Sequence, residues 1–92
     1  MNRAERLFVI LQRHGGKATL GTILDEVRED GGLAYKFTAS VSELRKQLEA
    51  ENLPRTVLCE RGKTASLNTY EIVQAERVDG KIVIQKRKEE KK

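Results

Sequence analysis

The chain has 92 residues, a net charge of +4 and a single cysteine. This length suits one domain, and one cysteine excludes an internal disulfide. No apolar run approaches the roughly 20 residues that a membrane helix needs, and the N-terminus lacks the apolar segment and cleavage site of a signal peptide. We therefore expect a soluble protein of the cytoplasm of a bacterial or archaeal host cell, with no membrane partner.

The excess positive charge lies at the C-terminus. Residues 77–92 contain seven Lys and Arg against three Asp and Glu, which leaves eleven of each in residues 1–76. A basic tail suits an anionic partner, and it suits a solubilising terminus equally well. We divide the chain into a domain over 1–76 and a basic extension over 77–92 that consists of a hairpin strand and a disordered tail.

Two amphipathic helices are expected first. Over residues 3–14, Ala4, Leu7, Phe8 and Leu11 form one apolar stripe, and Gly15-Gly16 ends the helix. Residues 17–18 form a short extended link, after which Thr19 is a good N-cap. Leu20, Ile23, Leu24 and Val27 then repeat at helical spacing, and acidic residues occupy the opposite face and the end of this helix.

A third helix is expected after the connector 33–37, in which Phe37 is the residue most suited to burial. Thr38 or Ser40 caps this helix, because the run from Ser40 to Glu43 fits a capping box. Val41, Leu44 and Leu48 form its inward stripe. Asn52 can stop the helix, and Pro54 prevents it from resuming.

Strand character follows. Residues 55–60 and 68–74 predict two strands joined by the polar loop 61–67, which together make a hairpin. Asp79-Gly80 suits a tight two-residue turn, so residues 82–84 are expected to return as a further strand. The order is therefore three helices followed by a hairpin.

This order, together with three segments, resembles the small winged helix-turn-helix proteins of bacteriophages and prophages. The segments are Gly15 to Leu24, Thr38 to Arg45 and Arg61 to Ile72. The resemblance covers about residues 4–73 and implies an α+β fold with three helices and a β-hairpin wing. The strand expected after Asp79-Gly80 is an extra C-terminal strand outside the resemblance. The resemblance also implies nucleic-acid binding through the third helix and the wing.

If Val41, Leu44 and Leu48 face inward, a rotation of about 100° per residue places Ala39, Ser42, Glu43 and Lys46 outward. Ser40 and Arg45 then lie at the flanks of the third helix. The wing is better supplied with basic side chains. We expect Arg55, Arg61, Lys63 and Thr64 to cluster on or near the loop 61–67 and to contact phosphates or the minor groove. The candidate nucleic-acid-binding residues are Thr38, Ser40, Ser42, Arg45, Lys46, Arg55, Arg61, Lys63 and Thr64.

Two functions remain open. The first is a DNA-binding transcriptional regulator of a phage or mobile element, with double-stranded DNA as its partner. The second is a phage-encoded inhibitor of a host nucleic-acid enzyme, such as an anti-CRISPR or polymerase-binding protein. The acidic second helix and the outward Glu43 favour the second. A homodimer through residues 81–85 or the first helix fits either function.

The sequence offers no catalytic or metal-binding constellation. His14 is the only histidine and lies at a helix end, where a cation interacts favourably with the helix dipole. One histidine and one cysteine do not make a zinc site. The run after Gly15 lacks the pattern of a phosphate-binding loop. We therefore expect no enzyme activity, no cofactor and no metal.

Overall fold

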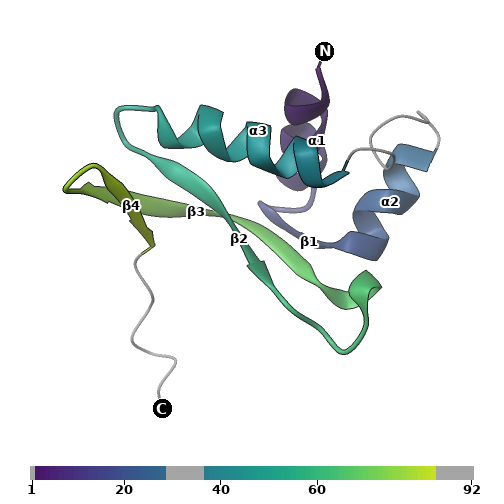
Figure 1. The fold of residues 1–92 in the computed structure, drawn as a ribbon. Helices are drawn as coiled ribbons and strands as arrows, with labels where there is room; N and C mark the ends of the chain where they lie inside the picture. Colours follow the sequence, from purple (N-terminus) through teal and green to yellow (C-terminus); the bar gives the residue numbers. More distant parts are fainter. Residues whose placement is uncertain (1, 29–36, 85–92) are drawn as a thin grey trace.

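The computed structural model describes residues 2–28 and 37–84 of the chain. It is an α+β structure with three helices and a four-stranded antiparallel sheet, which agrees with the expected class (Figure 1). No helix among the described residues is long and apolar enough to cross a membrane. The elements in chain order are α1 (Arg3–Arg13), β1 (Lys17–Thr19), α2 (Leu20–Arg28), α3 (Phe37–Glu49), β2 (Arg55–Glu60), a 3₁₀ turn η2 (Ala65–Leu67), β3 (Thr69–Val78) and β4 (Lys81–Ile84).

Helix α1 begins in a capping box, in which Asn2 and Glu5 each accept a hydrogen bond from the other's backbone N–H. It ends where Gly15 and Gly16 adopt positive φ angles of 74° and 94°, as the glycine pair predicts. The buried stripe includes Ile10, which the predicted stripe lacked, and Phe8 is only partly buried. The stripe is thus rotated slightly toward Ile10.

The short link before α2 is a strand. Lys17–Thr19 forms β1, which pairs antiparallel with β3, so that Lys17 lies opposite Glu71. Thr19 caps α2 as predicted, because its hydroxyl accepts a hydrogen bond from the Thr22 N–H at 3.2 Å. Ile23 and Val27 of α2 are fully buried.

Helix α3 begins earlier than the capping box predicts. Its first residue is Phe37, which packs against the core and contacts Tyr70 edge-on, with ring centroids 5.1 Å apart. Ser40 therefore lies inside the helix and is 0% exposed, so the expectation that it caps α3 or reaches a partner is wrong. The helix ends at Glu49, three residues before Asn52.

The sheet has the strand order β1-β3-β2, and β4 pairs with the far end of β3. Strand β2 has the predicted bounds, whereas β3 runs four residues further than predicted and crosses the expected division between residues 76 and 77. Asp79 and Gly80 have φ angles of 52° and 77°, which fits the predicted tight turn before β4. The expected disordered tail lies outside the described residues.

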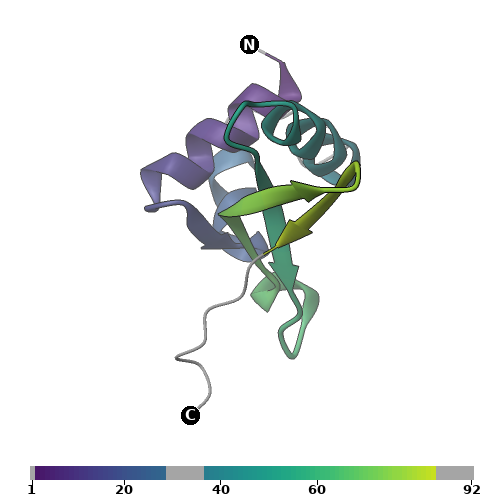
Figure 2. The same ribbon diagram turned by 90° about the vertical axis from the view of Figure 1, so that its left-hand side faces the viewer.

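The helices and the sheet form two layers around one core. Figure 2 shows α1 and α3 side by side above the crossing strands, and the β2–β3 hairpin projects below them. The fully buried side chains Leu7, Leu11, Ile23 and Leu44 come from the helices, and Val57 comes from β2. The hydrophobic core ends at the base of the β2–β3 hairpin. The far end of this hairpin therefore projects from the body of the molecule.

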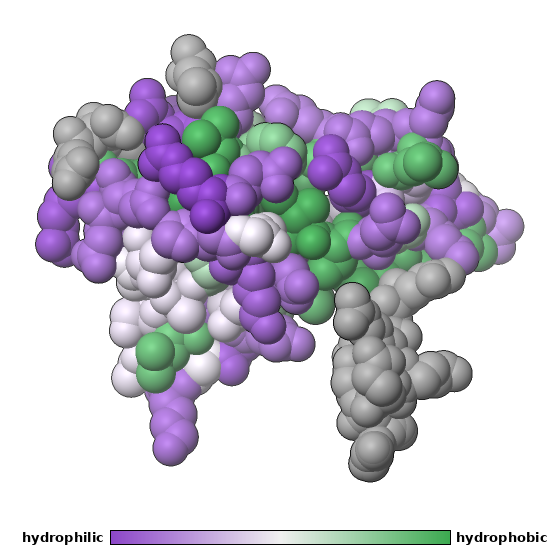
Figure 3. Space-filling model, turned by 180° about the vertical axis from the view of Figure 1, so that it is seen from behind, coloured by the Kyte–Doolittle hydropathy of each residue, from purple (hydrophilic) through white to green (hydrophobic). Residues whose placement is uncertain are grey.

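The back of the molecule is mostly hydrophilic. Hydrophobic surface gathers in a strip across its middle, with smaller spots toward both ends (Figure 3). The large apolar side chains that are most exposed are Leu53, Leu67, Val78 and Val83. They lie in the α3–β2 loop, the η2 turn and the β3–β4 hairpin, outside the packed helices.

Candidate nucleic-acid interface

One flank of α3 and the base of the β2–β3 hairpin enclose a groove of about 260 Å³, hereafter the α3–hairpin groove. It is lined by Phe37, Thr38, Val41, Ser42, Arg45, Cys59 and Tyr70. Thr38, Ser42 and Arg45 were predicted from the sequence as binding residues of the third helix. The helix and the hairpin therefore border one shared surface, as a joint binding face requires.

Arg45 is held in place at the edge of this groove. Its Nε donates a hydrogen bond to the backbone carbonyl of Val57 in β2, at 3.0 Å. A guanidinium has five N–H donors, so this bond leaves its terminal nitrogens available for a ligand. Fixing the side chain beforehand reduces the conformational entropy that binding would cost.

Tyr70 forms the sheet side of the groove. Burial raises the pKa of its hydroxyl, and the contact with Cys59 acts in the same direction. Its phenol therefore stays neutral across the physiological range and can donate or accept a hydrogen bond. Cys59 lies opposite Tyr70 in the β2–β3 register and is partly buried.

The wing, which we define as the loop 61–68 between β2 and β3, is tightly closed. The Gly62 N–H donates to the side-chain carbonyl of Asn68 at 2.8 Å. A Cβ on Gly62 would lie 2.6 Å from both the Cβ and the carbonyl oxygen of Leu67, so only glycine fits. Arg61, Lys63 and Thr64 are exposed on this closed loop, as predicted.

The wing is also attached to the start of α2. The Leu20 N–H donates to the Asn68 carbonyl at 2.8 Å, and Gly21 lies close to the backbone of Ser66. One of the N–H groups that a helix start leaves unsatisfied thus finds its acceptor in the wing. The position of the wing is consequently set by α2 as well as by the strands.

Arg55 does not lie near the wing as predicted. It begins β2 at the opposite end from the loop and forms a two-bond ion pair with Glu51, each bond 3.0 Å long. Its guanidinium also lies 5.6 Å from the ring centroid of Phe8. Proximity in sequence suggested a cluster, but a six-residue strand separates Arg55 from the loop. We remove Arg55, along with the buried Ser40, from the candidate site.

The outward face of α3 is less acidic than the sequence suggests. Glu43 lies 3.6 Å from Arg3 of α1, so its carboxylate faces α1 and is partly neutralised. Ser42 and Lys46 are exposed as predicted.

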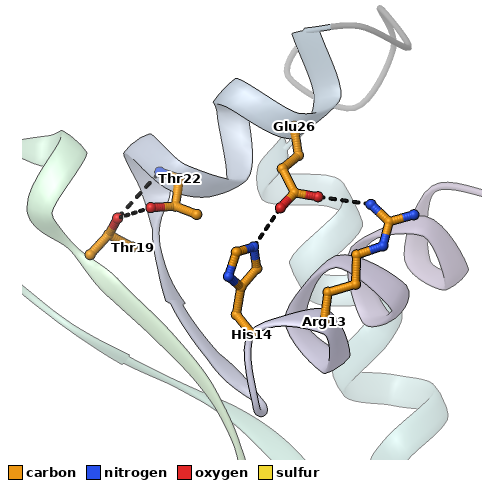
Figure 4. A network of polar contacts seen from close by, with 5 residues as sticks. All are labelled: Arg13, His14, Thr19, Thr22 and Glu26. Atoms are coloured by element: carbon orange, nitrogen blue, oxygen red, sulfur yellow. Dashed lines mark hydrogen bonds and ion pairs between the residues drawn. The ribbon is translucent and has the colours of Figure 1, made fainter.

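The acidic side of α2 is also partly neutralised. Glu26 accepts hydrogen bonds from His14, at the end of α1, and from Arg13, at 2.9 Å (Figure 4). These two bonds hold the pKa of the Glu26 carboxyl below its ordinary value. His14 is thus a hydrogen-bond partner of Glu26 that helps to join α1 to α2. Glu29 and Asp30, the acidic residues expected at the end of this helix, lie outside the described residues.

A second groove was not foreseen from the sequence. It measures about 550 Å³ and lies between α1 and the C-terminal half of α3, hereafter the α1–α3 groove. Its lining residues are Glu5, Phe8, Val9, Leu44, Gln47, Leu48, Glu51 and Arg55. Phe8, predicted to lie in the buried stripe of the first helix, lines this groove instead and is only partly buried.

Within residues 2–28 and 37–84, no group of three or more His, Cys, Asp or Glu side chains could hold a metal ion. We compared the chain with protein-family models, with curated proteins and with solved structures, and none of the three comparisons found a match. The function is therefore inferred from the geometry and charge of the chain's own residues.

Proposed function

We propose that the protein is a DNA-binding winged-helix protein that regulates transcription in a phage or mobile element. Two features of the fold support this. Helices α2 and α3 lie in sequence between β1 and β2, and the returning strand β3 lies in space between the same two strands. This arrangement places a helix beside a projecting hairpin, which is the geometry that the winged-helix resemblance implies.

The observation that carries the proposal is the distribution of cations. Most arginines on the helices face carboxylates, as in the pairs Arg13–Glu26 and Arg3–Glu43. By contrast, Arg61 and Lys63 on the wing and Lys46 on α3 have no ion-pair partner among the described residues. Cations that the fold does not neutralise are the ones available to phosphates.

The binding mode follows from these positions. Helix α3 enters the major groove with Lys46 toward the bases, since its ammonium group can bond base edges. Arg61 and Lys63 on the wing contact phosphates or the neighbouring minor groove. Because the wing is already closed by Gly62 and Asn68, little ordering is needed on binding.

The test is the fluorescence anisotropy of a labelled duplex, measured across a series of salt concentrations. We expect the double variant Arg61→Ala/Lys63→Ala to bind more weakly and to reduce the slope of log affinity against log salt by about 1.8, since each phosphate contact contributes about 0.9. The matched control is Arg13→Ala, which removes an arginine that faces Glu26 and leaves the wing intact. Absence of wild-type binding at low salt would overturn the proposal.

A second candidate is a protein-interaction module that acts on a host nucleic-acid enzyme. The α1–α3 groove favours it, since its floor of Phe8, Val9, Leu44 and Leu48 is apolar and its rim is charged. In this case purified host polymerase forms a complex of fixed stoichiometry on size-exclusion chromatography. Val9→Glu would abolish that complex, whereas Arg61→Ala/Lys63→Ala would leave it intact.

A further inference from the structure

The α3–hairpin groove carries three hydrogen-bonding side chains on one flank of α3. Thr38, Ser42 and Arg45 are spaced by four and three residues, so they lie in a row along the helix. Across the groove, Tyr70 adds a phenol that burial keeps neutral. The row thus offers one cation and several neutral hydroxyls to whatever enters.

The charge of this groove is positive. Among the described residues that line it, Arg45 is charged and none carries a carboxylate. Glu49, one turn beyond Arg45, accepts a hydrogen bond from the Thr56 hydroxyl at 2.7 Å, so its carboxylate is engaged outside this groove. Because the Nε of Arg45 is bonded to the Val57 carbonyl, the guanidinium is fixed beside the groove rather than free in solvent. A guanidinium with hydroxyl donors suits a phosphate group.

We propose that the α3–hairpin groove binds one phosphate group of the nucleic-acid backbone, with Arg45 as its charged contact and Thr38 and Ser42 as hydroxyl donors. This inference rests on the proposed DNA-binding function and makes it more specific. Phe37 and Val41 form an apolar floor against which the sugar next to the phosphate packs. Arg45 therefore fixes the register of α3 on the duplex, while Lys46 and the wing contact other positions.

The direct test is a ¹H–¹⁵N NMR titration of the wild-type protein with inorganic phosphate, in which chloride holds the ionic strength constant. We expect shifts of the Arg45 Nε–H signal and of the Thr38 and Ser42 amides. Arg45→Gln should abolish these shifts. Lys46→Gln, which removes the same charge from the adjacent residue outside the groove lining, should preserve them.

Two further arms keep the result decisive. Ser42→Ala changes an exposed side chain, so it should leave the fold intact and weaken phosphate binding about twofold to fivefold, as expected for one hydrogen bond. If Arg45→Gln loses its native spectrum, the effect of Ser42→Ala on phosphate binding decides whether the groove is the phosphate site. Titration with thymidine, which has a base and no phosphate, should leave the groove signals in place. Shifts with thymidine that equal those with phosphate would overturn the proposal.

The same variants are then measured on the duplex. We expect Arg45→Gln to weaken binding about tenfold, and more than Lys46→Gln does. If the duplex binds the wild type but phosphate shifts only wing signals, or if Arg45→Gln binds as tightly as the wild type, the phosphate site is overturned and the proposed function stands. If phosphate shifts the groove signals and no duplex binds, the phosphate site is supported and the proposed function falls.

Discussion

The helical end of the molecule and the wing are stabilised by different kinds of contact. Where α1 meets α2 and α3, charged side chains form pairs, such as Arg13 with Glu26 and Arg3 with Glu43. The wing is closed by the fit of Gly62 and by neutral hydrogen bonds to Asn68. Arginine and lysine thus serve the fold at one end, whereas at the other they remain free for a ligand. Four substitutions test this contrast.

The largest effect is expected from Gly62→Ala. The added Cβ would lie 2.6 Å from the Leu67 backbone, which cannot move without opening the wing. We expect a loss of about 1–3 kcal/mol in the free energy of unfolding, measured with urea. Gly21→Ala is the control, because its Cβ would lie 3.2 Å from the Ser66 carbonyl and because alanine favours a helix. An equal loss in both variants would contradict the tight closure of the wing.

Asn68→Ala is expected to have a smaller effect. The Gly62 N–H loses its acceptor, which costs about 1 kcal/mol. Hydrogen exchange at the Gly62 amide should accelerate in the variant, while exchange within α1 should not change. Thr64→Ala is the control, since among the described residues its hydroxyl bonds to the exposed Ser66 alone. An unchanged exchange rate at Gly62 would show that the loop closes without Asn68.

Arg77→Ala tests a charged contact at the far end of β3. The Arg77 guanidinium donates to the backbone carbonyls of Glu49 and Glu51, which joins the β3–β4 hairpin to the end of α3. Since this contact is exposed, we expect a loss of only about 0.5–1 kcal/mol on urea unfolding. Lys81→Ala, on the same hairpin, removes a cation that forms no such bond and should change stability less. Equal effects would argue against the docking contact.

The smallest effect concerns pH. His14 and Arg13 lower the pKa of Glu26 in the folded state below its ordinary value of 4.5, so the stabilisation is present above that value. It is lost as the pH falls through the lower, folded-state pKa. Thermal unfolding of Glu26→Gln should therefore vary less between pH 5 and pH 3 than that of the wild type. Identical pH profiles would contradict a role for this exposed pair in stability.

Features that depend on neighbouring residues were predicted from the sequence, whereas features that depend on distant residues were not. The cap at Thr19, the bounds of β2 and the turn at Asp79-Gly80 depend on neighbouring residues, and local rules predicted them. Strand β1 has three residues and exists because it pairs with β3, about 50 residues away. No local pattern signals such a pairing.

Some residues of the candidate site were also predicted correctly from the sequence, and others were not. Arg61, Lys63 and Ser42 are exposed where the turn and the helical periodicity place them. Ser40 was predicted to cap the third helix. Because α3 already begins at Phe37, Ser40 lies inside the helix, where it is buried. Arg55 pairs with Glu51, four residues earlier, and its guanidinium lies 5.6 Å from the ring centroid of Phe8, so it belongs to the α1–α3 groove. The ion pairs that join different helices, Arg13–Glu26 and Arg3–Glu43, were visible only in three dimensions.

Strand β3 has a consequence for how this chain can vary. It is at once the returning strand of the wing and the first strand of the β3–β4 hairpin. Side chains alternate between the two faces of a strand, so inserting one residue within Thr69–Val78 would exchange inside and outside for everything beyond it. In both hairpins the inward and outward positions are therefore fixed by the same strand. Insertions or deletions are tolerated only in the turns at the two ends of β3.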